Sequence, residues 1–182
     1  MSLNLFLVVH LILVKAEGIL EFPECLLNPP TQEIGEDSRS HRQVHSEINN
    51  LADRPMRFIQ MWFFPHQQGL TPSVKQKKVE KNERANKLLP LVSNEDKRSL
   101  KIASDAKVYS CFLQKGKTAA YQFKEGYGGY LYVLEGGPLA VKNETLQRLD
   151  ALIIRREDRI IMSAKNQTEL LFVVVSLANK FS

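Results

Sequence analysis

A histidine and a glutamate two residues apart, His45 and Glu47, are the side chains of this 182-residue chain best suited to metal chemistry. In a β-strand, residues i and i+2 point to the same face with Cα atoms about 7 Å apart, so both can reach one ion. His41 shares that face if the strand begins early, and is a candidate third ligand. Two ligands alone make a weak, exchangeable site, because transition-metal sites normally use three or more protein ligands. From residue types alone, a hydrogen bond between His45 and Glu47 is the favoured interpretation.

The other candidate groups are assigned structural roles. His66 follows Pro65 in a predicted turn and is expected to be exposed. Trp62 belongs to an apolar strand and is expected in the core, as aromatic side chains in such strands usually are. The two cysteines, Cys25 and Cys111, lie far apart in no metal-binding spacing. This pattern predicts no disulfide framework and a reducing compartment.

The net charge of +5 is concentrated in one stretch, Lys75 to Lys87. Glutamates interrupt that stretch and no aromatic side chain is available there to stack on bases, so a surface turn or linker is favoured over a nucleic-acid patch. At 43% hydrophobic and 25% charged residues, the chain is too apolar for a disordered tail and too charged for a membrane protein. We therefore expect neither nucleic acid nor membrane as a partner.

Short strand-like segments dominate the chain and predict a mainly β fold. Most are four to eight residues long, rich in β-branched or aromatic residues, and bounded by Gly, Pro, Asn or Asp. The predicted strands are Leu5–Val14, Ile19–Phe22, Arg57–Phe64, Leu100–Ile102, Lys107–Leu113, Thr118–Phe123, Gly129–Leu134, Leu139–Val141, Ala151–Ile154, Arg159–Ala164 and Glu169–Leu177. Only Ser93–Lys97 and Asn143–Arg148 could form a turn or short helix. Residues 129–134 are apolar on both faces, which is typical of a strand covered on both sides or lining a barrel.

The N-terminal apolar run, residues 3–14, has two interpretations. It could be the hydrophobic region of a secretory signal, with small residues at positions 14 and 16 near a cleavage site. No Lys or Arg precedes it, however, and His10 interrupts it before the Glu17-Gly18 turn signal. A buried strand is therefore favoured, and the run is too short to span a bilayer as a helix. We expect a cytoplasmic protein, with secretion as the alternative if residues 1–16 are a signal peptide.

A faint internal repeat suggests two similar barrels. An apolar strand, a Glu-Gly turn and an apolar return strand occur around Lys15–Leu20 and again around Val133–Leu139. Glycine supplies the positive φ of such a tight turn. Pro65–Pro72 is a proline- and glycine-marked crossover between the two halves. We expect a first barrel over residues 1–68, a basic crossover linker over 69–90 and a second barrel over 91–182.

Three motifs, in their order and spacing, resemble the pirin family. They are His45-Ser46-Glu47, the strand Arg57–Pro65 with its tryptophan, and Leu70–Gln76, in which Val74 stands in place of the usual aromatic residue. The strands of the family's second barrel are similar to Ser99–Ile102, Asp105–Tyr109 and Leu170–Val174. The resemblance covers most of the chain after position 45. It implies a bicupin fold, that is, two β-barrels of the cupin type.

The resemblance also implies one divalent transition metal in the N-terminal barrel, with iron expected and nickel or copper as alternatives. Family members hold it with three histidines and a glutamate, which assigns His45 and Glu47 as ligands and Glu47 as a candidate general base. The family's His-x-His pair, counted back from Glu17-Gly18, falls on Asn4 and Phe6, and neither replaces a histidine. We therefore expect an incomplete N-terminal barrel with impaired metal binding, and a second barrel without metal.

Two functions from different classes remain open. The resemblance implies a metal-dependent dioxygenase of the quercetinase type, acting on a flavonol-like small molecule. The alternative is a non-catalytic cupin scaffold that acts as an interaction or regulatory protein with a protein partner. We expect a monomer in either case. Metal content discriminates the two functions.

Overall fold

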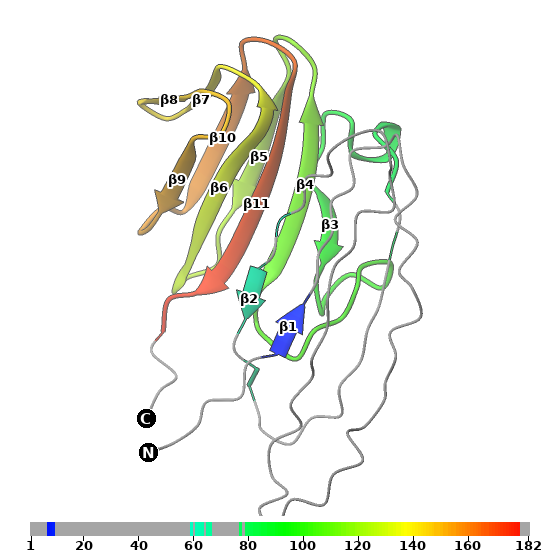
Figure 1. Ribbon diagram of the computed structural model, residues 1–182. Coiled ribbons are helices and arrows are strands. Elements are labelled where there is room, and N and C mark those ends of the chain that lie inside the picture. The colour runs from blue at the N-terminus through cyan, green and yellow to red at the C-terminus, as the bar shows by residue number, and fades with distance from the viewer. Residues whose placement is uncertain are drawn as a thin grey trace, which may run out of the picture. The chain divides into compact units, whose positions relative to one another are not determined.

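The computed structural model describes residues 7–9, 59, 61–63, 65–66, 77 and 79–178 (Figure 1). The chain divides into two units, Met1–Gln76 and Lys77–Ser182, and almost all described residues belong to the second. Within the described residues, no helix has the length and apolar character needed to cross a membrane.

The described part of the first unit is a pair of short strands. β1 (Leu7–Val9) runs antiparallel to β2 (Met61–Phe63), with Val8 opposite Trp62. The N-terminal apolar run therefore contains a strand, as predicted, and β2 lies inside the predicted strand 57–64. The predicted strand 19–22 lies outside the described residues.

The described part of the second unit consists of two antiparallel sheets. Its elements are η1 (Asn82–Arg84, a 3-10 turn), β3 (Leu89–Val92), β4 (Lys107–Leu113), β5 (Thr118–Gln122), β6 (Tyr127–Gly136), β7 (Leu139–Val141), β8 (Glu144–Leu146), β9 (Ala151–Ile154), β10 (Arg159–Ala164) and β11 (Thr168–Ser176). The five-stranded sheet has the order β3-β4-β11-β6-β9, and the four-stranded sheet has the order β5-β10-β7-β8. Figure 1 shows these two sheets stacked on one another. The predicted mainly β fold is confirmed.

The hydrophobic core lies between the two sheets. Side chains of a strand alternate between its faces, so every second residue of β4 and β11 points inward. The core residues of these two central strands are Cys111, Leu113, Leu170, Phe172 and Val174. The facing sheet contributes Ala119, Leu139, Val141, Leu146, Ile160, Met162 and Ala164. Burying one such large apolar side chain contributes about 1.5–3 kcal/mol, so this shared core holds the two sheets together.

Four aromatic rings, here called the aromatic cluster, fill one end of the core: Tyr109, Tyr121, Phe123 and Phe172. The ring of Phe172 lies 5.1 Å from that of Tyr121 and 5.9 Å from that of Phe123, both in edge-to-face geometry, which is the favourable arrangement for aromatic pairs. Gly129 on β6 makes room for the cluster, because a Cβ at that position would lie 2.6 Å from the ring of Phe172. The ring of Phe172 therefore packs directly over the backbone of β6 at Gly129.

Most strand predictions agree with the structure. Residues 107–113, 139–141, 151–154 and 159–164 are strands with the predicted bounds. The ends of β5, β6 and β11 differ from the predicted ones by two residues or fewer. In β6, Leu131 and Val133 are buried while Tyr130 is 46% exposed. The strand therefore lines the barrel interior with one face and is not covered on both sides.

Two predictions about local structure were wrong, and one strand was not predicted. Residues 100–102 are not a strand, since only Leu100 forms an isolated bridge, with Val92. The predicted turn or short helix at 143–148 is strand β8, because pairing with β7 buries Leu146 in the core. Strand β3 was not predicted, because Pro90 argues against a strand in sequence. It is tolerated there because β3 is the edge of its sheet.

The second half of the basic stretch packs against the five-stranded sheet. Arg84 Nη2 lies 3.1 Å from Glu169 Oε2 on β11, and Lys81 Nζ lies 3.3 Å from Glu169 Oε1. The ammonium of Lys81 also lies 3.9 Å from the ring centre of Phe112 on β4, a cation–π contact. The side chains of Glu169 and Arg84 are nearly buried, so the carboxylate of Glu169 balances the positive charge of Arg84 within the fold. The predicted domain limits stay predictions, because most of residues 1–78 lie outside the described part.

Candidate functional site

The predicted metal residues lie in the part of the chain that the structure does not describe. This applies to His45, Glu47 and the candidate substitute His41, and to Asn4 and Phe6 at the positions of the missing pair. Their assignment stays a prediction. His66 is described and is exposed, as expected.

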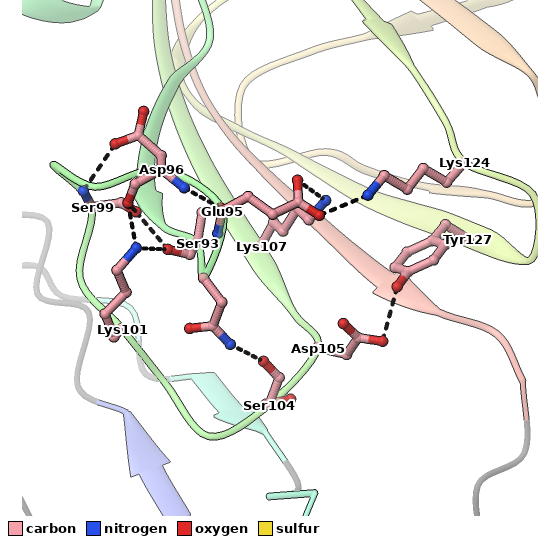
Figure 2. A network of polar contacts seen from close by, with 11 residues as sticks. Ser93, Glu95, Asp96, Ser99, Lys101, Ser104, Asp105, Lys107, Lys124 and Tyr127 are labelled. Carbon is pink, nitrogen blue, oxygen red and sulfur yellow. Dashed lines mark hydrogen bonds and ion pairs between the residues drawn. The ribbon is translucent and has the colours of Figure 1, made fainter.

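A cluster of charged side chains lies at one end of the second barrel, where β4 and β6 begin and β5 has just ended (Figure 2). Its centre is the carboxylate of Glu95. Glu95 Oε2 lies 2.8 Å from Lys107 Nζ, and Glu95 Oε1 lies 2.7 Å from Lys124 Nζ. Beside them, the hydroxyl of Tyr127 donates a hydrogen bond of 2.8 Å to Asp105. We call these five residues the Glu95 cluster.

The loop between β3 and β4, residues 93–106, presents Glu95 to the two lysines. The hydroxyl oxygen of Ser93 accepts a hydrogen bond from the backbone N–H of Glu95, at 3.1 Å. The carboxylate of Asp96 accepts bonds from the backbone N–H groups of Arg98 and Ser99, at 2.7 and 3.1 Å. Ser and Asp favour such side-chain-to-backbone turns. The segment 93–97, for which a turn or short helix was predicted, is therefore a turn that fixes the base of Glu95.

Lys107 is the unusual member of this cluster, because its side chain is 8% exposed whereas that of Glu95 is 58% exposed. A buried ammonium is costly unless it is paired, so Glu95 is needed mainly to satisfy Lys107. Sequence reasoning assigned no role to this pair. The signal in the sequence was a lysine at the first position of the mainly apolar strand Lys107–Leu113, on the face of the strand that points into the barrel.

The two lysines strongly perturb the titration of Glu95. The hydrogen bond from Lys107, followed by that from Lys124, lowers the pKa of Glu95 to about 2. Because this folded-state pKa lies below the ordinary value of 4.5, the ionised carboxylate stabilises the fold above that ordinary value. The contribution is lost as the pH falls from 4.5 towards about 2. Solvent screens the exposed Glu95, so we expect about 1 kcal/mol at neutral pH.

Replacing Glu95 by glutamine should therefore remove an acid-sensitive part of the stability. At pH 7 the Glu95→Gln protein should be less stable than the unmodified one, and the difference should shrink as the pH approaches 2. Urea unfolding followed by circular dichroism over a pH series measures this difference.

The matched control is Glu125→Gln, because Glu125 is exposed and forms no ion pair with the described residues. That variant should track the unmodified protein at every pH. A gap between the Glu95→Gln and unmodified proteins that stays constant down to pH 2 would contradict the assigned role.

The barrel interior next to the Glu95 cluster offers no reactive group. Burial, followed by the neighbouring Tyr121, raises the pKa of Tyr109, so its phenol stays protonated. The hydrogen bond to Asp105 raises the pKa of Tyr127. Burial raises the pKa of the Cys111 thiol to about 11, which keeps it from forming the nucleophilic thiolate. Among the described residues, this end of the barrel therefore holds ion pairs, aromatic packing and three groups that stay protonated at neutral pH.

The described donors also do not fit a transition metal. Within the described residues, no three His, Cys, Asp or Glu side chains gather in a metal-binding arrangement. The groups that meet at the barrel end are ammonium and phenol groups with two carboxylates that are already paired. The described residues of this barrel therefore provide no set of metal ligands.

Comparison with known proteins adds the family context. The family model described as the quercetinase C-terminal cupin domain matches residues 91–175. A provisionally named quercetin 2,3-dioxygenase of Zymomonas mobilis is 35% identical over 163 residues, which cover 87% of this chain and 68% of that protein. A provisionally named quercetin 2,3-dioxygenase of Pseudomonas aeruginosa is 30% identical over 88% of this chain and 70% of its own length.

Solved structures show the same fold. YhhW from Escherichia coli matches with a TM-score of 0.62 at 21% identity, over 68% of this chain and 51% of that one. A structure of the bacterial pirin YhhW in complex with nickel(II) matches equally well, with 52% of its length covered. The chain thus spans about half the length of these solved structures. At this identity the likeness establishes the cupin fold of the described part.

Proposed function

The chain belongs to the pirin family, and on that premise we propose that it is a quercetinase-like protein with a weakened metal site. Its remaining metal ligands are His45 and Glu47, with His41 as a candidate third. The second barrel serves as a metal-free scaffold. The described residues include only part of a pirin chain. The activity, the substrate and the partners are therefore proposed together with the metal site.

The observation that carries the proposal is the distribution of metal donors along the chain. The described barrel provides no donor set. The family's His-x-His pair corresponds to Asn4 and Phe6, of which phenylalanine cannot ligate and the asparagine amide is a poor ligand. Of the two family motifs that supply metal ligands, only His-Ser-Glu is therefore complete in this sequence. Since the number of ligands governs affinity, the site should bind its metal more weakly than a site with four protein ligands.

A bound iron, nickel or copper ion would supply Lewis acidity and dioxygen chemistry toward a flavonol-like substrate. The chain's own residues have simpler tasks. The imidazole of His45 would hold the ion, and a carboxylate oxygen of Glu47 would either ligate it or accept the proton of a substrate hydroxyl. Fewer protein ligands also leave more open coordination positions, which makes the ion easier to lose.

Removing either retained ligand should strongly reduce the metal binding and the flavonol oxidation of the protein. We expect His45→Ala and Glu47→Gln to lower the metal content and the quercetin turnover together, by about tenfold or more. The control is His66→Ala, because His66 is exposed and lies in neither motif. Metal analysis of the purified proteins and oxygen uptake with quercetin give the two readouts. Unchanged metal content in His45→Ala would contradict the ligand assignment.

A second function, a non-catalytic cupin scaffold in the cytoplasm, is favoured by the packed core of the second barrel. The aromatic cluster packs inside that barrel, and a barrel with a packed interior presents its outer surface to a protein partner. In this reading the protein is a monomer that binds neither nucleic acid nor membrane. A preparation that holds no metal and does not turn over quercetin, even with added iron, nickel or copper, would favour the scaffold over the enzyme.

A further inference from the structure

Strand β9 forms one edge of the five-stranded sheet, where β6 is its single neighbour among the described strands (Figure 1). An unpaired edge can pair with another chain, and proteins usually prevent this with a proline or a charged residue in the edge strand. Two of the other edge strands carry such a residue, Pro90 in β3 and Glu144 in β8. The sequence of β9 is Ala-Leu-Ile-Ile, with neither. This edge is therefore open to pairing.

The backbone groups at this free edge belong to Ala151 and Ile153. In an antiparallel pair, residues bonded to the neighbouring strand alternate with residues whose N–H and C=O point to the other side. The carbonyl oxygen of Asp150 accepts a hydrogen bond of 3.0 Å from the N–H of Val133 on β6. Every second residue from Asp150 onward therefore faces β6, and the N–H and C=O groups of Ala151 and Ile153 face away from it.

The surface beside this edge is apolar and exposed. Ile153 is 63% exposed, and Tyr130, which lies opposite it on β6, is 46% exposed. Leu149, two residues before β9, is 47% exposed. Single exposed apolar residues are common, whereas a group of them beside an open edge is typical of an interaction surface. Covering these side chains would remove apolar surface from water, which is favourable.

Charges of opposite sign flank β9. Asp150 precedes the strand, and Arg155 and Arg156 follow it. Neither arginine forms an ion pair with any residue that the structure describes. When two copies of one strand pair antiparallel around a two-fold axis, the beginning of each copy lies beside the end of the other. The charges around β9 are therefore complementary to those of a second copy.

We propose that two copies of this chain associate through β9, antiparallel around a two-fold axis at Ile153. The N–H of Ile153 in each copy donates to the C=O of Ile153 in the other, which joins the two five-stranded sheets into one. Residues opposite one another lie on the same face, so the two Ile153 side chains meet on the outer face. Asp150 of each copy lies beside Arg155 and Arg156 of the other.

This association is weak, because the paired edge is only four residues long. The chain is therefore a monomer when dilute, as expected above, and dimerises as its concentration rises. The contact uses none of the proposed metal ligands and does not depend on the metal.

The test uses two charge-reversed forms of the full-length protein. One form carries Asp150→Lys, and the other carries Arg155→Glu together with Arg156→Glu. In a dimer of either form with itself, like charges meet at both ends of the paired strands. In a mixed dimer of the two forms, opposite charges meet at both ends. Sedimentation velocity measures the association of the unmodified protein, of each form and of their equimolar mixture.

We expect the unmodified protein to be about half dimeric at about 0.1 mM. Each charge-reversed form should associate about tenfold more weakly, and their mixture should regain the affinity of the unmodified protein. An unmodified protein that stays monomeric at about 1 mM would overturn the proposal. So would a mixture of the two forms that associates no better than each form alone.

A matched pair of exposed isoleucines locates the contact. Ile153→Lys places a charge in the edge strand and should abolish the dimer. Ile161→Lys is the control, because Ile161 is 49% exposed but lies on β10 in the other sheet, and it should leave the dimer unchanged. Circular dichroism checks that both variants keep the fold. Dimerisation that Ile153→Lys does not weaken would show that the copies meet elsewhere and would overturn the proposal.

Discussion

Replacing Phe172 by alanine is expected to lower the free energy of unfolding of the second unit by about 3–5 kcal/mol. Phe172 is buried at the centre of the aromatic cluster, and its ring contacts those of Tyr109, Tyr121 and Phe123 at centroid distances of 6.2, 5.1 and 5.9 Å. The surrounding strands are paired on both sides of β11 and cannot collapse into the cavity left behind. Urea unfolding followed by circular dichroism measures the loss.

The control for this substitution is Ile153→Ala. Ile153 is a large apolar residue on the edge strand β9, but it is 63% exposed. Truncating it removes little buried area, so the change should stay within about 0.5 kcal/mol. If Phe172→Ala costs no more than Ile153→Ala, the aromatic cluster is not the centre of the core and the described packing is wrong.

Gly136→Ala should destabilise the second unit by about 2–5 kcal/mol, through two separate effects. Gly136 ends β6 with a φ of +80°, a conformation that costs other residues about 1–2 kcal/mol. An added Cβ would lie 1.9 Å from the backbone oxygen of Gln167, and relieving such overpacking costs about 1–3 kcal/mol more. The clash falls beside the irregular pairing of β6 with β11 at Glu169, so the two strands would have to separate there.

Gly116→Ala separates these two effects. Gly116 has a similar φ of +76°, but a Cβ there would meet nothing within 4 Å. Its substitution should therefore show the conformational cost alone, and Gly136→Ala should cost clearly more. Equal losses in the two variants would mean that β6 and β11 do not approach one another as closely as described.

Local sequence signals were sufficient for most strands of the second unit and failed at residues 143–148, where strand pairing and core packing decide the structure. Residues 107–113 and 159–164 combine β-branched or aromatic residues with clear turn signals, and both strands were predicted with their observed bounds. Residues 143–148 carry an Asn-Glu start that is typical of a turn or helix. The segment becomes β8 because β7 offers a pairing edge and the core accepts Leu146.

The ion pairs of the structure could not be predicted from the sequence, because their members are far apart along the chain. Arg84 and Glu169 are separated by 85 positions, and Lys124 lies 29 positions from Glu95. The family, in contrast, followed from three short motifs, because their order and spacing carry information that no single motif has.

The central claim is that this pirin has a weakened metal site because Asn4 and Phe6 stand where its relatives' second pair of ligands is expected. The most direct measurement is metal affinity, by competition with a chelator, in the unmodified protein and in a double variant carrying Asn4→His and Phe6→His. We predict that the double variant binds iron or nickel at least about tenfold more tightly, a gain of about 1.4 kcal/mol or more, and that His45→Ala abolishes the gain. Equal affinity in the two proteins, with one metal ion per chain retained by both, would contradict the claim.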